Sequence, residues 1–246
     1  MGVSVRFLGT GDAFNARGRC HSSYLVSAPG ATILLDCGAS ALVALQRDGV
    51  GIDRLDAVCL SHLHGDHFAG LPFIFIAATF DVPRQRPLTI VGPPGTAARV
   101  ADLYRAMYRD LASKPLPFPV HYVEVGDGAR TPIAAAELLA FAVPHQEHEL
   151  SLGYRLAIEN RVVLYSGDTG WSEVLVTQSQ GADLFICECC FFETKVDFHI
   201  DYPRLAAERH RFGCRRLVLS HCGREVLAHR DEIAETIASD GLVVDL

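Results

Sequence analysis

Short apolar runs, separated by glycines and by Pro29, open the chain and predict β-strands, because turn residues typically bound strand segments. The predicted strands of this half are residues 3–8, 22–26, 32–35 and 57–60. A helix is expected over residues 40–48, between the third and the fourth of these strands. The chain therefore begins with strands and then alternates strand with helix.

The second half carries a clearer strand signal, an alternation of apolar and polar positions with a period of two. The apolar positions are Leu152, Tyr154, Leu156 and Ile158, and they alternate with Ser151, Gly153, Arg155 and Ala157. Glu159-Asn160 then predicts a turn into a strand over residues 161–165, so the two strands form a hairpin. Further apolar runs predict strands at residues 138–143, 184–187 and 216–219.

A helix is predicted over residues 201–212 from its end signals. Asp201 is placed to cap its start, Pro203 falls in its first turn and Gly213 follows its end. In mid-chain, two irregular regions with several prolines, residues 81–94 and 114–119, predict loops around a strand at 88–91 and a helix at 96–113. The longest apolar stretch, residues 68–80, is expected to be a buried segment.

Strands dominate both halves, and the helices are placed to cover outer faces. This pattern predicts an α/β sandwich with two mixed sheets inside and helices outside. No low-complexity tract, charge block or Ser/Gly linker divides the chain, so residues 1–246 are expected to form a single domain.

Composition narrows the class of protein. Apolar residues make up 49% of the chain and charged residues 21%, which is typical of a soluble globular protein. The formal net charge is −7, because 22 Lys and Arg face 29 Asp and Glu, and this argues against a broad basic face for nucleic acid. No run approaches the roughly 18 apolar residues that cross a bilayer, so no membrane partner is expected.

Cysteine usage bears on the compartment. The chain has eight cysteines, and the first nine residues lack a signal-peptide pattern. Reduced thiols and a cytoplasmic location are therefore expected, rather than a disulfide framework.

The strongest chemical signal directly follows the strand at residues 57–60. The sequence His62-Leu63-His64-Gly65-Asp66-His67 places three imidazoles and a carboxylate within six residues. This donor set suits zinc above other metals, although Mn²⁺ and Fe²⁺ tolerate the same ligands. His62 and His64 can point at one ion, while Asp66 and His67 begin the next helix and can reach a second.

This cluster resembles that of the metallo-β-lactamase superfamily, and the resemblance covers essentially the whole chain. It implies a four-layer αββα sandwich and two divalent metal ions. Asp36 matches the aspartate that braces the histidine loop, and His145 matches the third ligand of the first metal. Asp168 matches the carboxylate that bridges both metals, and His221 matches the last ligand of the second. His148 competes with His145 for its role and stays an alternative.

The resemblance also implies a reaction. Such centres lower the pKa of bound water to roughly 7, so a metal-bridging hydroxide is available at neutral pH for hydrolysis. The metals, two carboxylates and the hydroxide leave about one positive charge on the centre, which attracts an anion despite the acidic chain.

Two features narrow the branch of the superfamily. Residues 7–13 and 87–95 resemble the ribonuclease Z and phosphodiesterase branch, in which a histidine beyond the bridging aspartate protonates the leaving oxygen. His199 matches that general acid and Glu188 matches the residue that orients it.

Only 22 residues separate His145 from Asp168, which leaves no room for the long basic arm that grips tRNA. We therefore expect a zinc phosphodiesterase for a small or cyclic phosphodiester, with nucleic acid disfavoured. The resemblance also implies a homodimer. The alternatives are an ester, lactone, thioester or sulfate-ester hydrolase on the same site, a ribonuclease Z-type tRNA 3′ endonuclease, and a non-catalytic metal-binding protein.

Overall fold

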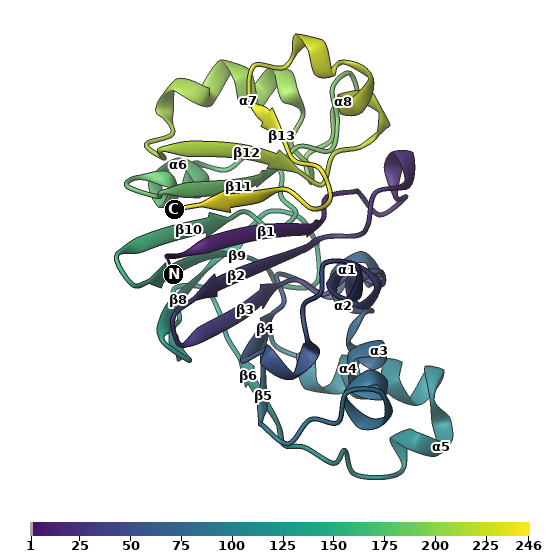
Figure 1. Cartoon of the computed structure of the whole chain (residues 1–246). Helices are drawn as coiled ribbons and strands as arrows, with labels where there is room; N and C mark the ends of the chain where they lie inside the picture. Colours follow the sequence, from purple (N-terminus) through teal and green to yellow (C-terminus); the bar gives the residue numbers. More distant parts are fainter. Residues whose placement is uncertain (1) are drawn as a thin grey trace.

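The computed structural model describes residues 2–246 of the chain. Two seven-stranded sheets make up its interior, and helices cover their outer sides (Figure 1). The purple and blue N-terminal part builds most of one sheet, and the green and yellow C-terminal part builds most of the other. The predicted four-layer α/β sandwich is confirmed.

The first sheet has the strand order β14-β1-β2-β3-β4-β5-β6. Its strands are β1 (Ser4–Gly9), β2 (Ser23–Ala28), β3 (Ala31–Leu35), β4 (Ala57–Cys59), β5 (Leu88–Gly92), β6 (Val120–Glu124) and β14 (Val243–Asp245). The pairs among β14, β1, β2 and β3 are antiparallel, whereas β4, β5 and β6 are added in parallel.

The second sheet has the order β13-β12-β11-β10-β9-β8-β7. Its strands are β7 (Arg130–Ile133), β8 (Ala136–Val143), β9 (Ser151–Ile158), β10 (Arg161–Tyr165), β11 (Leu184–Glu188), β12 (Arg216–Ser220) and β13 (Thr236–Ile237). An antiparallel meander from β7 to β10 is followed by parallel strands, so the two halves repeat one topology.

Helices connect the parallel strands and form the outer layers. Beside the first sheet lie α1 (Ala41–Arg47), α2 (Gly65–Phe68), α3 (Leu71–Phe80), α4 (Thr96–Met107) and α5 (Arg109–Ala112). Beside the second lie α6 (Glu173–Ser179), α7 (Tyr202–Glu208) and α8 (Arg224–Ala228). None of these helices is long and apolar enough to traverse a lipid bilayer.

Three apolar layers hold the sandwich together. Strand β3 shows how alternation builds them: Ile33 and Leu35 belong to the layer between the sheets, and Leu34 belongs to the layer under the first set of helices. A third layer lies between the second sheet and its helices. The central layer runs up to Tyr24 and Tyr165, whose rings lie 5.0 Å apart just below the site described next.

Several predicted boundaries need correction. The helix expected over residues 96–113 breaks at Tyr108, which has a non-helical backbone (φ −136°, ψ 59°). The helix expected over 201–212 ends as an α-helix at Glu208, and one 3₁₀ turn continues it. The apolar stretch 68–80 is mostly α3, and its last residue, Phe80, is 65% exposed rather than buried.

Candidate metal centre

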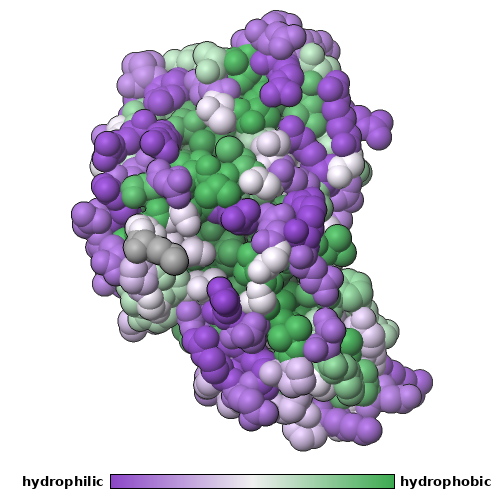
Figure 2. Space-filling view, viewed as in Figure 1, coloured by the Kyte–Doolittle hydropathy of each residue, from purple (hydrophilic) through white to green (hydrophobic). Residues whose placement is uncertain are grey.

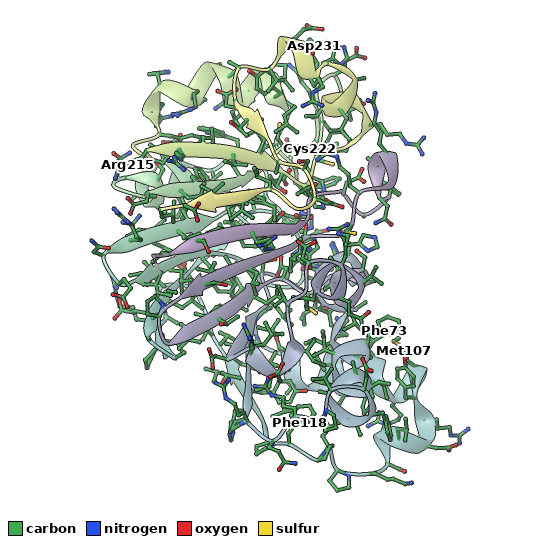
Figure 3. All side chains as sticks on the ribbon, viewed as in Figure 1. Phe73, Met107, Phe118, Arg215, Cys222 and Asp231 are labelled. Carbon is green, nitrogen blue, oxygen red and sulfur yellow. The ribbon has the colours of Figure 1, made fainter. Side chains whose placement is uncertain are left out.

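Loops at one edge of the two sheets carry the predicted site residues. They follow β3, β4, β8, β10, β11 and β12, whose carboxyl ends meet there because these strands run in the same direction within each sheet. Figure 3 marks this edge, because Cys222 directly follows His221 in the loop after β12. Ligand sites commonly form at such carboxyl edges.

Three histidines form a first group of donor atoms. The Nε2 atom of His62 lies 3.1 Å from Nδ1 of His64, and Nε2 of His145 lies 3.2 Å from the same atom. Tetrahedral zinc with its usual Zn–N bond length places its ligand atoms about 3.3 Å apart. The three nitrogens therefore have the spacing of ligands around a single ion.

Two carboxylates and two histidines form a second group. Nε2 of His67 lies 3.2 Å from one oxygen of Asp66 and 3.2 Å from Oδ2 of Asp168. Nε2 of His221 lies 3.3 Å from each of the same two oxygens. This second set has the same spacing as the first, with oxygen and nitrogen donors.

Asp168 lies between the two groups. Its Oδ2 atom, part of the second group, is also 3.9 Å from Nε2 of His62 and 3.9 Å from Nε2 of His145. No other carboxylate among the described residues has contacts of this kind with both groups. Asp168 is thus placed where a bridging ligand is needed.

Asp36 supports the histidine loop from beneath. Its Oδ1 accepts from the backbone N–H of Ser61 at 2.7 Å, and its Oδ2 accepts from the Ser61 hydroxyl at 2.7 Å and from the Tyr165 hydroxyl at 2.5 Å. Oδ2 is also 2.7 Å from Nδ1 of His67, and this fixes the ring so that its Nε2 faces the second group. Asp36 therefore contacts both the start of the histidine loop and one of its rings.

Two residues of the site, one supporting residue and one donor, have a strained backbone. Asp36 has φ 55° and His221 has φ 52°, in the left-handed region that non-glycine residues seldom adopt. Strain of this kind persists only where the surrounding structure fixes it, and it clusters at functional sites. Gly167, next to Asp168, has φ 61° and adopts the same region without a side-chain penalty.

The electrostatics of the second group favour a cation. Burial alone raises the pKa of the Asp66 carboxyl, but His67 and His221 more than offset this and hold it well below its usual range. Burial lowers the pKa of His67, yet Asp168, Asp66 and Asp36 together raise it well above its usual value. Three carboxylates therefore surround one imidazole ring, Asp36 at Nδ1 and Asp66 and Asp168 at Nε2, and favour positive charge there.

The donor atoms fit a pair of divalent metal ions. His67 Nε2, Asp168 Oδ1 and His221 Nδ1 are buried without a hydrogen-bond partner, although buried polar atoms in proteins normally have one. Of these atoms, His67 Nε2 faces the second group, where a bound ion would satisfy it. Imidazole and carboxylate donors at this spacing are those of zinc and of related first-row metals.

A histidine–carboxylate pair lies beside these groups. Nδ1 of His199 is 2.7 Å from Oε1 of Glu188, which is 1% exposed. The same carboxylate accepts from the backbone N–H of Thr169 at 2.7 Å and of Cys190 at 3.1 Å. A ring nitrogen of His199 lies within 4.8 Å of donor atoms of His145 and Asp168.

The alternative ligand His148 is not brought to the cluster. Its side chain is 85% exposed and its nearest carboxylate is Glu147, at 3.9 Å. The residue after His145 is closer: Nε2 of Gln146 lies 3.0 Å from Nε2 of His64. Gln146 belongs to none of the motifs that sequence analysis used, so its position was not predicted.

His21 is a second neighbour of the site to which the sequence motifs assign no role. It is half-buried, and its Nδ1 atom is buried without a partner. A Cβ added at Gly38 would lie 2.4 Å from Cβ of His21 and 2.3 Å from the backbone oxygen of Asp66, so glycine lets these three segments pack closely. This proximity arises from chain folding that no local motif reveals.

A cavity of about 700 Å³ opens over both groups. Its wall includes His199 and Cys190, and its aromatic rim includes Phe14, Phe191 and Phe198. Phe14 is 82% exposed and Phe198 is 49% exposed. Among the described residues that line this cavity, none is Lys or Arg.

The amino-acid sequence was compared with protein-family models and with curated proteins. The family model described as "Anti-Pycsar protein Apyc1" matches residues 3–236. A ribonuclease Z of Mycobacterium marinum is 28% identical over 96% of this chain and 92% of its own length.

Two solved structures show the same fold across nearly all of both chains. The metallo-β-lactamase fold protein YhfI of Bacillus subtilis has a TM-score of 0.78 and 21% identity, with all of both chains covered. A diphosphatase of the PhnP family has a TM-score of 0.79 and 16% identity, and covers 99% of this chain and 98% of its own. The chain therefore belongs to the Apyc1 family, and it is a metal-dependent hydrolase with the metallo-β-lactamase fold.

Proposed function

We propose that this protein is a dinuclear-zinc phosphodiesterase that acts on a small or cyclic phosphodiester. The observation that carries this proposal is the His199–Glu188 pair, held within 4.8 Å of donor atoms of His145 and Asp168. A phosphodiester with an alkoxide leaving group needs a general acid at this place, whereas many ester substrates do not.

The site residues have two proposed roles: most are ligands of the ions, and one is a proton donor. The proposed ligands of the two ions are His62, His64, His145, Asp66, His67, Asp168 and His221. Bound there, the ions supply positive charge for the phosphate and lower the pKa of the attacking water. Asp66 and Asp168 offset part of that positive charge, so the centre favours a reactant with little negative charge of its own.

His199 is the proposed proton donor. Burial lowers the pKa of its imidazole, but the charge and the hydrogen bond of Glu188 more than offset this and raise it to about 9. The carboxylate of Glu188 therefore favours the protonated form of the ring, which is the form that can donate a proton. Its Nδ1 proton is held by Glu188, so its Nε2 proton is the one available to a leaving oxygen in the cavity.

The lining of the cavity favours a singly charged and compact substrate. Without Lys or Arg among the described lining residues, only the bound ions and the His199 imidazolium balance phosphate charge. A diester carries one negative charge and a monoester up to two, so the diester is favoured as substrate. The exposed rings of Phe14 and Phe198 at the rim can contact a planar part such as a nucleoside base.

The short segment between His145 and Asp168 disfavours the tRNA endonuclease alternative. The segment between His145 and Asp168 contains the hairpin of β9 and β10, which lies in the second sheet. No part of it extends as a basic arm. A pre-tRNA 3′ cleavage assay tests this alternative directly, and cleavage faster than that of small diesters would replace the proposal.

Replacing His199 by Ala tests the reaction class. We expect kcat for a cyclic nucleotide, which has an alkoxide leaving group, to fall about 10²- to 10⁴-fold. Turnover of bis(p-nitrophenyl) phosphate should fall far less, because p-nitrophenolate leaves without a proton. The exposed His210 provides the control, and His210→Ala should change neither rate.

Two results would count against the proposal. Equal losses on both substrates would show that His199 does not act as an acid toward the leaving group. No turnover of any phosphodiester by protein loaded with Zn²⁺, Mn²⁺ or Fe²⁺, together with ester or lactone hydrolysis, would assign the site to the alternative ester chemistry.

The remaining expectations are part of the same proposal: one domain, a cytoplasmic enzyme and a homodimer. Phe80, at the end of α3, and Met107, at the end of α4, are exposed apolar side chains. Figure 2 shows a green patch on the lower right, in the region where Figure 3 labels Met107. Sedimentation velocity tests the dimer, and Phe80→Ser tests whether the exposed end of α3 contributes to it. A single cooperative unfolding transition tests the one-domain arrangement.

A further inference from the structure

A cysteine stands in the wall of the cavity, beside the proposed proton donor. Cys190 follows β11, is 5% exposed and lines both the main cavity and a neighbouring one of about 350 Å³. The proposed reaction gives this thiol no role.

The thiol belongs to a third group of possible metal donors. One donor atom each of Cys190, His199 and His221 lie within 4.8 Å of one another. The rings of His199 and His221 are stacked, with centroids 5.5 Å apart and planes inclined by 16°. Because Nδ1 of His199 is engaged by Glu188, the atom of His199 that remains for a ligand is Nε2.

The surrounding backbone fixes this arrangement. Oε1 of Glu188 holds His199, and Oε2 of the same carboxylate accepts from the backbone N–H of Cys190 at 3.1 Å. The Cys190 carbonyl accepts from Gly223 N–H at 3.1 Å, and a Cβ at Gly223 would lie 2.4 Å from that carbonyl oxygen. A single carboxylate and a close glycine therefore hold the thiol and the imidazole side by side.

The donor chemistry of this group differs from that of the catalytic cluster. The seven proposed catalytic ligands offer only nitrogen and oxygen, whereas Cys190 offers sulfur. Thiolate with imidazole selects soft or borderline ions such as Zn²⁺ and Cd²⁺, and disfavours Mn²⁺ and Mg²⁺. His221 is already a proposed ligand of the catalytic ions. The ligands that bind only the additional ion are therefore Cys190 and His199.

We propose that Cys190 and His199, which lie next to His221, form an additional cation site for a soft divalent ion. Binding of this ion inhibits the enzyme. On binding, the Cys190 thiol and the His199 imidazolium each release a proton to solvent, and their lone pairs bind the ion. His199 can then no longer donate a proton to a leaving group. The inhibition, but not the binding, rests on the proposed function.

Cadmium spectroscopy tests the binding without any turnover. Cadmium thiolates absorb in the ultraviolet, and the catalytic cluster contains no sulfur, so this absorption reports only a cysteine site. We expect the wild-type protein, titrated with Cd²⁺ to saturation, to show the amplitude of one thiolate per chain. Cys190→Ser should lose this absorption, and His199→Ala should require at least about tenfold more Cd²⁺ to reach it.

Cys214→Ser is the matched control. Cys214 is half-buried and belongs to none of the possible metal groups among the described residues, so this variant should keep the absorption. Absorption that survives in Cys190→Ser, or that is absent from the wild type at saturation, would overturn the proposal. If Cys190→Ser fails to fold, Cys190→Ala replaces it, with circular dichroism as the check.

Excess zinc tests the inhibition. Zinc-loaded wild type and Cys214→Ser should lose phosphodiesterase activity as free Zn²⁺ rises. Cys190→Ser should need at least about tenfold more Zn²⁺ for half-inhibition, relative to its own uninhibited rate. Equal sensitivity of all three proteins would overturn the inhibitory role. Cadmium absorption without any phosphodiesterase activity would instead overturn the proposed function and leave the cation site standing.

Discussion

Replacing Glu188 by Gln is expected to move the alkaline limb of the kcat profile toward lower pH. The carboxylate is buried and lies 2.7 Å from Nδ1 of His199, whose pKa it raises to about 9 against the opposing effect of burial. A general acid acts only while it is protonated, so activity falls as the pH rises through this pKa. A Gln at position 188 keeps a hydrogen-bond acceptor but removes the negative charge.

The magnitude follows from the strength of a charged hydrogen bond. Such bonds contribute about 1.5–3 kcal/mol, and one pKa unit corresponds to about 1.4 kcal/mol, so a shift of about one to two pH units is expected. Solvent screens this pair little, because the His199 side chain is 13% exposed and that of Glu188 is 1% exposed. Bound divalent ions lower the pKa of His199 in both proteins, so the difference between the two profiles is the quantity to measure.

The assay compares kcat for a cyclic nucleotide from about pH 6 to about pH 10. This range covers the expected pKa of His199 both in the wild type and in Glu188→Gln. Glu193→Gln is the matched control, because Glu193 is exposed in the same segment and should leave the profile unchanged. Metal content is measured in parallel, because Glu188 also accepts from Thr169 N–H, next to Asp168. An alkaline limb at the same pH in Glu188→Gln and wild type would refute the reasoning.

Three further predictions concern the ligands and their support. His145→Ala should lose one bound ion per chain while His148→Ala keeps both, and equal losses by metal analysis would reject the choice of His145. Asp36→Asn should weaken metal binding about 10- to 100-fold in a chelator competition, because the loop loses the charge that orients it; unchanged affinity would contradict this role. Gly38→Ala should destabilise the fold by about 1–3 kcal/mol in urea unfolding, because its Cβ would meet backbone at 2.3 Å. Gly65→Ala has open space around its Cβ and should cost much less; similar costs would show that crowding is not the cause.

Local sequence was sufficient where a strand and its following loop carry the signal. The loop from His62 to His67 and the residues Asp36, Asp168 and His221 all directly follow short apolar strands, and the structure brings them to one edge. Within each sheet this could be predicted because parallel strands end at the same edge, and the resemblance to the superfamily implied that the two sheets bring these edges together.

Other features depend on contacts between distant segments. Strands β6, β7, β13 and β14 lie at or next to sheet edges and were not predicted, since their short or half-polar sequences show no clear period. The break at Tyr108 and the exposed end of α3 follow from tertiary packing. The positions of His21, Gln146 and Cys190 beside the cluster have no local signal, because none belongs to a ligand motif.

Anomalous X-ray scattering from crystals of the zinc-loaded protein tests the central claim most directly. The predicted result is two zinc peaks about 3.5–4 Å apart. One peak should lie among His62, His64 and His145, the other should lie between His67 and His221, and Asp168 should contact both. A single peak, or peaks away from these residues, would contradict the account.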